Sequence, residues 1–157
     1  MSIKPKFDII HAILALREIG TTKSIEYLKN IACYKNMDIQ GSSVLTIAKL
    51  SNGRENDFFG KLLLDKEYKS KWYAMWAIFF KANEKALPYV LEYGVNKVKN
   101  CKKIPECGWL ILLYLARYAP DNEQSRKIFS RINKDFENMP SYIGDELKKE
   151  FPDIFGK

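Results

Sequence analysis

An unbroken run of apolar and aromatic residues between two lysines dominates the middle of the chain, at positions 72–80. The run lacks the strict alternation that would mark a half-buried strand. It is also too short to cross a bilayer as a helix, which takes about 20 apolar residues. A helix that is apolar on every side is normally covered on every side. The run therefore predicts a central helix over residues 71–81, buried by helices that pack before and after it.

The length of the chain, 157 residues, suggests one domain, and 46% of the residues are hydrophobic. Such a chain can bury a core without a disulfide or a metal ion. The formal net charge is +7, which favours an acidic partner, such as an acidic protein face, nucleic acid or an anionic membrane surface. The charge is spread over lysines, so solvated surface lysines are the ordinary explanation.

The three cysteines show no Cys-x-x-Cys spacing, and the chain has one histidine. This is poor material for a zinc site, so we expect no metal and no cofactor. Reduced thiols are the simplest interpretation, and they are typical of a cytoplasmic protein. The first apolar stretch is interrupted by charged residues, so we expect neither a signal peptide nor a membrane anchor.

Apolar residues recur at spacings of three and four along most of the chain, which is typical of amphipathic helices. Gly20 and Pro88 fit the end of the first helix and the first turn of the sixth. Asp38 is expected to cap the third. The predicted helices cover about residues 8–19, 24–34, 39–50, 55–64, 71–81, 84–98, 106–118, 122–137 and 141–151.

Small and large residues also repeat with a period of 31. Small residues let neighbouring helices approach closely, and a large one fills the space between layers. Helix pairs that repeat at a fixed period are typical of a solenoid. An ordinary helical bundle with accidental periodicity is the alternative. The matched positions are Ala12, Ser43 and Ala74, then Ala15, Thr46 and Ala77, then Leu16, Ile47 and Ile78.

Three segments resemble a known family. The stretch from Arg17 to Leu28 looks like the turn between the two helices of a HEAT-like repeat of the short bacterial type. Asp38-Ile39-Gln40 is similar to the opening helix of that family. Residues 85–90 resemble its second helix, with the proline in the usual place. The resemblance covers about residues 7–137.

The resemblance implies an all-α fold: a right-handed alpha–alpha superhelix of about four HEAT-like helix pairs with a short C-terminal helix. The second helices would line a concave face, and such surfaces bind large partners. We expect a single domain over residues 1–157, with pairs at about 7–35, 38–65, 70–99 and 105–138 and a last helix at 141–151.

Catalytic chemistry is poorly supported, so we expect no enzyme. His11 stands alone beside an apolar stripe, whereas a general base needs a partner and a cleft. Cys107 has no base near it in sequence and fits an inert buried thiol. Asp65 and Glu67 lie among lysines and fit a solvated ion-pair cluster. Phosphate loops and metalloprotease motifs are missing from the sequence.

The first functional hypothesis is a protein-binding module. Tyrosine beside basic residues suits an acidic partner surface. Small HEAT-like proteins are similar to bacterial immunity proteins, which neutralise a toxin by direct binding, so a basic inhibitor would face an acidic toxin. The expected partner-binding residues, on exposed second-helix positions, are Lys23, Tyr27, Tyr89, Tyr93, Lys97, Arg126, Arg131 and Lys134.

The second hypothesis is nucleic-acid binding by a basic face, as in HEAT-like glycosylases that act on alkylated bases. Its phosphate contacts would come from Lys97, Lys99, Lys102 and Lys103, and Trp72 or Trp76 would be available for stacking. Against it, both tryptophans lie in the run expected to be buried, and arginine is scarce.

Overall fold

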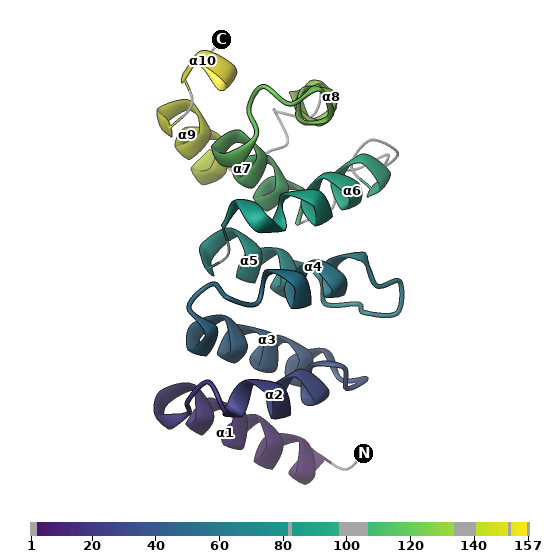
Figure 1. The fold of residues 1–157 in the computed structure, drawn as a ribbon, viewed down its shortest axis with the longest axis vertical. Coiled ribbons are helices and arrows are strands. Elements are labelled where there is room, and N and C mark those ends of the chain that lie inside the picture. The colour runs from purple at the N-terminus through teal and green to yellow at the C-terminus, as the bar shows by residue number, and fades with distance from the viewer. Residues whose placement is uncertain (1–2, 82, 98–106, 134–140, 151, 157) are drawn as a thin grey trace. The chain divides into compact units, whose positions relative to one another are not determined.

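Every described element is helical, which confirms the expected all-α class (Figure 1). The computed structural model describes residues 3–81, 83–97, 107–133, 141–150 and 152–156. The helices are α1 (Ile3–Ile19), α2 (Ser24–Ala32), α3 (Met37–Ser51), α4 (Asn56–Leu64), α5 (Lys71–Lys81), the short 3-10 helix η1 (Glu84–Ala86), α6 (Leu87–Lys97), α7 (Gly108–Tyr118), α8 (Glu123–Asn133), α9 (Ser141–Glu150) and α10 (Pro152–Phe155).

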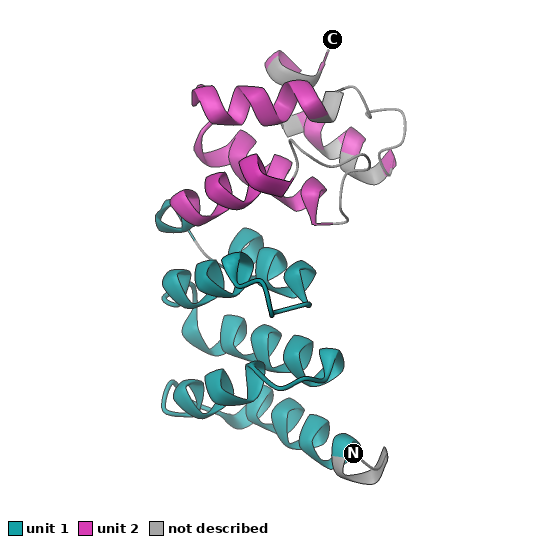
Figure 2. Cartoon of the chain, turned by 90° about the vertical axis from the view of Figure 1, so that its right-hand side faces the viewer, with its two compact units in different colours: residues 1–86 teal, residues 87–157 magenta. Residues whose placement is uncertain are grey.

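The chain forms two compact units, residues 1–86 and residues 87–157, shown in teal and magenta in Figure 2. The sequence predicted one domain over the whole length. We describe each unit by itself.

In the first unit, α3 packs against α1 and α2 on one side and against α5 on the other, and α4 packs against α5. The contacts between these helices join residues about one sequence period apart. Lys49 Nζ lies 2.9 Å from Glu18 Oε2, at a separation of 31 residues. Ser70 Oγ donates a buried 2.6 Å hydrogen bond to Gln40 Oε1, at a separation of 30 residues. The period in the sequence therefore corresponds to the spacing of neighbouring helices in this unit.

The repeated small positions explain how closely these helices pack. Ser43 and Thr46 on α3, and Ala74 and Ala77 on α5, are fully buried. Gly41 makes the closest approach, because a Cβ added there would lie 2.4 Å from Tyr73 Cε2. A larger residue at these positions would push the helices apart.

Asn36 caps the start of α3, where the sequence predicted Asp38. The Asn36 side chain accepts hydrogen bonds from the backbone N–H groups of Asp38 and Ile39, at 3.1 and 3.2 Å. Asp38 lies in the first turn, where its charge still suits the helix dipole. At the end of α3, Asn52 and Gly53 adopt left-handed backbone conformations, with φ of 47° and 82°. Asparagine and glycine tolerate that region better than other residues.

The prediction that α5 is covered on every side is wrong. Its small residues and Met75 and Ile78 are buried. The large aromatic residues Trp72, Tyr73, Trp76 and Phe79 are half-buried, and Phe80 is 53% exposed. Small side chains bring the neighbouring helix close to the helix axis, which leaves the wide rings at the edges of the contact. The helix that is buried all round is α7, from Gly108 to Ala116.

In the second unit, α6 contacts α7 and α8, α7 contacts α8, and α9 contacts α10. Gly94 on α6 allows the approach of α8, since a Cβ there would lie 2.8 Å from Ile128 Cδ1. Ile128 and Phe129 form the buried side of α8, and the other side carries polar residues. The core of this unit therefore centres on α7.

Candidate functional site

The expected binding residues fall in both units. On α2 and just before it, Tyr27 and Lys23 are exposed. On α6 and α8, Lys97 and Arg126 are exposed, and Tyr89 and Arg131 are half-buried. Arg126 is 3.0 Å from Asp121, so part of its charge is neutralised locally. Four of the expected residues lie outside the described part of the chain: Lys99, Lys102, Lys103 and Lys134.

The exposure expected for Tyr93 is wrong. Its side chain is 7% exposed, and its hydroxyl lies 3.6 Å from the sulfur of the buried Cys107. Tyr93 precedes Gly94, on the part of α6 that packs within the second unit, and the close approach at Gly94 draws this stretch inward. The residue contributes to the core and not to the surface.

Four exposed residues lie on α2 and on the residues that flank it. Lys23, Tyr27 and Asn30 are separated by four and three positions, which places them on one helical face, and Tyr34 lies in the turn after α2. Tyr27 is 65% exposed and Tyr34 is 48% exposed. We call these four residues the tyrosine stripe. The opposite face of α2 carries Ile25, Leu28 and Ala32, all buried, so burial of that face orients the stripe outward.

An ion-pair cluster anchors α2 beside the stripe. Lys29 Nζ is 2.7 Å from Glu26 and 2.8 Å from Glu55, and it lies over the ring of Phe58. Burial alone would lower the pKa of Lys29. The two carboxylates outweigh burial, so the pKa of Lys29 is raised and its ammonium group stays protonated. The cluster ties α2 to the start of α4 and holds the surface in place.

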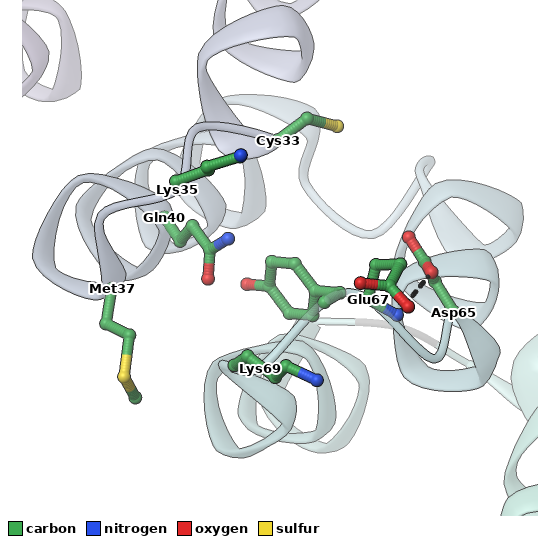
Figure 3. Close-up of a pocket in the computed structure, with 8 residues that line it drawn as sticks. Cys33, Lys35, Met37, Gln40, Asp65, Glu67 and Lys69 are labelled. Atoms are coloured by element: carbon green, nitrogen blue, oxygen red, sulfur yellow. Dashed lines mark hydrogen bonds between the residues drawn. The ribbon is translucent and has the colours of Figure 1, made fainter.

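A pocket with a volume of about 480 Å³ opens between the α2–α3 turn and the α4–α5 turn (Figure 3). Cys33 and Lys35 lie on one side of it in Figure 3, and Asp65 and Glu67 lie on the other. Because Lys35 follows Tyr34 directly, the pocket lies next to the end of the tyrosine stripe. Its lining is Cys33, Lys35, Met37, Gln40, Asp65, Glu67, Tyr68 and Lys69.

The α4–α5 turn is held by backbone contacts of its charged residues. The Asp65 carboxylate accepts a 2.9 Å hydrogen bond from the backbone N–H of Glu67. The Lys71 ammonium donates to the backbone carbonyls of Leu62 and Asp65. These contacts satisfy carbonyl groups at the end of α4. The two carboxylates therefore shape a turn, and nothing in their geometry indicates a paired acid and base.

Tyr68 also lines this pocket and is 2% exposed. Its hydroxyl makes no well-formed hydrogen bond within the described residues. Burial raises the pKa of Tyr68 far above its ordinary value, and the nearby Ser70 hydroxyl offsets only part of the rise. The phenol therefore stays protonated at any physiological pH.

The other candidate groups are scattered. His11 is exposed on α1, with its ring 6.5 Å from that of Phe7. Cys33 is exposed and Cys107 is buried. Within the described ranges, no three side chains of His, Cys, Asp or Glu gather as a metal site would require. A helix with the length and apolar character needed to cross a bilayer is likewise missing from this part of the chain.

The sequence missed Tyr34 and the pocket. Tyr34 lies seven positions after Tyr27, so extending the helical period by two turns would have found it. The pocket could not be found in this way, because it depends on two turns about 30 residues apart that meet only in the folded unit. Comparisons with protein-family models, with curated proteins and with solved structures gave no match to this chain.

Proposed function

We propose that this chain is a non-catalytic protein-binding module built from HEAT-like helix pairs. The first unit supports this through its packing, in which α1, α3 and α5 succeed one another at the 31-residue period. The architecture that we propose is a right-handed superhelix of about four such pairs with a short last helix. Stacked pairs offer extended surfaces and few enclosed cavities, which suits a macromolecular partner.

The tyrosine stripe is the observation that carries the proposal. Tyrosine supplies a large contact area with little side-chain entropy to lose, and it is enriched among residues that dominate interface energies. Tyr27 is such a side chain on the exposed face of α2, whose other face is buried in the core, and Tyr34 is a second one in the turn that follows α2. Both rings are therefore accessible to a partner.

The partner should be acidic where it meets this surface. Lys23 lies at one end of the stripe and Lys35 directly follows Tyr34 at the other, and the chain as a whole carries +7. Complementary charge speeds association and sets orientation more than it adds affinity. An immunity protein that neutralises an acidic toxin in the cytoplasm is the biological role that we favour.

The test is capture of the product of a neighbouring gene by the full chain, followed by calorimetry on the purified pair. We expect Tyr27→Ala with Tyr34→Ala to weaken binding by about 100-fold or more, as for interface residues that dominate the energy. Phe80→Ala is the matched control, because Phe80 is an exposed aromatic residue of α5 and not a member of the stripe.

Two outcomes would overturn the proposal. The first is a stripe variant that folds normally and binds the partner as tightly as the native chain. The second is strong binding to nucleic acid that weakens steeply with salt, with no bound protein. That result would favour the basic-face alternative, in which exposed Lys97 contacts phosphate.

A further inference from the structure

The pocket between the α2–α3 and α4–α5 turns carries charges of both signs that are not paired with one another. Lys35 lies on one side of it, and Asp65 and Glu67 lie on the other (Figure 3). In the part of the chain that the structure describes, none of these three side chains takes part in an ion pair. Opposite charges elsewhere in this unit do pair, as Lys29 does with Glu55. The pocket therefore keeps its opposite charges apart and accessible.

A buried amide adds a hydrogen-bond donor to the lining. Gln40 is 6% exposed, and its Oε1 accepts the 2.6 Å hydrogen bond from Ser70. This bond fixes the orientation of the amide, which points into the pocket in Figure 3. Among the described residues, Gln40 Nε2 has no hydrogen-bond partner, and it is not sealed from solvent. The Nε2 group is therefore free to donate to an acceptor that enters the pocket.

The lining is neutral as a whole but divided between its two sides. Lys35 and Lys69 balance Asp65 and Glu67. Lys69 belongs to the α4–α5 turn, where its Nζ lies 3.3 Å from the carbonyl oxygen of Lys66. That turn therefore keeps a net negative charge, whereas the α2–α3 turn contributes the positive charge of Lys35. A complementary ligand would be neutral overall, with one cationic end and one anionic end.

We propose that this pocket binds a short free peptide. The terminal ammonium of the peptide would face Asp65 and Glu67, and its terminal carboxylate would face Lys35 and the Gln40 amide. Charge-assisted hydrogen bonds of both kinds are stronger than neutral ones. A single amino acid carries both charges on one carbon, whereas two or three residues separate them by up to about 7–11 Å. This site is distinct from the protein-binding role proposed above and does not depend on it.

The size and openness of the pocket set the expected affinity. Its volume of about 480 Å³ lies within the range of about 300–1,000 Å³ that is typical of small-ligand sites. Its charged side chains Lys35, Asp65 and Glu67 are exposed, and exposed ion pairs contribute little each. We therefore expect weak binding, with a dissociation constant of about 0.1–1 mM.

Titration of the isotope-labelled full chain with trialanine, followed by nuclear magnetic resonance at constant salt, tests the proposal. We expect saturable shifts of backbone amide signals in the two turns that form the pocket. N-acetyl-trialanine lacks the ammonium, and trialanine amide lacks the carboxylate. Each should bind at least about threefold more weakly than trialanine, because one of the two charge contacts is lost. Free alanine should bind more weakly than trialanine as well.

Two variants assign each end of the peptide to its side of the pocket. Glu67→Gln should weaken trialanine at least about threefold but leave N-acetyl-trialanine unchanged, since that peptide has no ammonium to lose. Lys35→Met should weaken trialanine by a similar factor but leave trialanine amide unchanged. The matched controls are Glu84→Gln and Lys85→Met, which make the same changes at exposed positions of η1 and should not alter binding. Thermal unfolding verifies the fold of each variant.

Three results would overturn the proposal. The first is the absence of saturable shifts up to about 10 mM trialanine, well above the expected dissociation constant. The second is equal binding of the free and the blocked peptides, which would show that the terminal charges are not recognised. The third is a normally folded Glu67→Gln or Lys35→Met chain that binds trialanine as tightly as the native chain, since the contacts would then lie elsewhere.

Discussion

Lys49 Nζ lies 2.9 Å from Glu18 Oε2, and the two residues are separated by one period of the sequence repeat. Both side chains are at least half exposed, so the pair adds little to stability. The pair is informative because it joins residues at equivalent positions of two successive first helices, α1 and α3. The buried bond between Gln40 of α3 and Ser70, directly before α5, joins the next two first helices at a separation of 30 residues.

Removing the Ser70 hydroxyl should destabilise the first unit. Ser70→Ala leaves Gln40 Oε1 buried without its 2.6 Å donor, which costs about 1–3 kcal/mol of the free energy of unfolding. Urea denaturation monitored by circular dichroism measures the change. Ser42→Ala, on the half-buried side of α3, serves as the control and should have a much smaller effect. Equal losses for both variants would mean that the hydrogen bond carries no special weight.

A methyl group at Gly41 should destabilise the protein only while Tyr73 keeps its ring. Gly41→Ala would place a Cβ 2.4 Å from Tyr73 Cε2, and overpacking of this kind costs about 1–3 kcal/mol. Alanine is otherwise favoured over glycine in a helix by about 1 kcal/mol. In a Tyr73→Ser background, the same change should therefore become stabilising. Thermal unfolding of the native chain, the two single variants and the double variant gives the sign of each change. If the sign does not reverse, the close contact is refuted.

Tyr68→Phe should leave stability unchanged or raise it by up to about 1 kcal/mol. The hydroxyl is buried and makes no well-formed hydrogen bond within the described residues, so its removal relieves a desolvation cost. Calorimetric unfolding of both proteins measures the difference. A loss of more than about 1 kcal/mol would show that the Tyr68 hydroxyl makes a hydrogen bond in solution. Ser70 would then be the first partner to test, through Ser70→Ala.

The pair between Glu18 and Lys49 should make stability depend on pH in the acid range. The hydrogen bond and charge of Lys49 hold the pKa of Glu18 below its ordinary value. A carboxyl group with a lowered pKa stabilises the folded state above its unfolded pKa, and the effect disappears as pH falls through the folded pKa. The native chain should therefore exceed Glu18→Gln in stability at neutral pH and match it in strong acid.

Chemical denaturation at both pH values, repeated in high salt, checks this expectation. Salt should shrink the difference at neutral pH, because the pair is exposed and screened. A difference that persists in strong acid would point to packing by the Glu18 side chain.

Much of the fold could be predicted because the pattern of apolar residues within a short stretch of sequence indicates a helix. The spacing of apolar residues along α1, α3 and α4 reflects which face meets the core, and the structure has helices at each of these places. The 31-residue period could also be read, since Ser43 and Ala74 must be small wherever two helices touch. Such features depend on neighbours in sequence or on strict repetition.

The errors arose where packing between helices decides the outcome. Tyr93 has the spacing of a surface residue, yet α6 turns it toward Cys107. Trp76 and Phe80 are apolar but lie at the edge of α5, where their tilted rings are 4.7 Å apart between centroids and stay partly exposed. The pocket near Lys35 requires two turns that meet in space. None of these facts is encoded in a short window of sequence.

The short sequence separation of the contacts in the first unit has a consequence for how it folds. Ser70 reaches Gln40, and Lys49 reaches Glu18, by closing loops of only about one helix pair, and short loops are entropically cheap to close. Assembly can therefore begin at any helix pair and spread to the next, with each step rapid. A lineage could lengthen or shorten such a chain one pair at a time while the pairs left behind keep their own contacts.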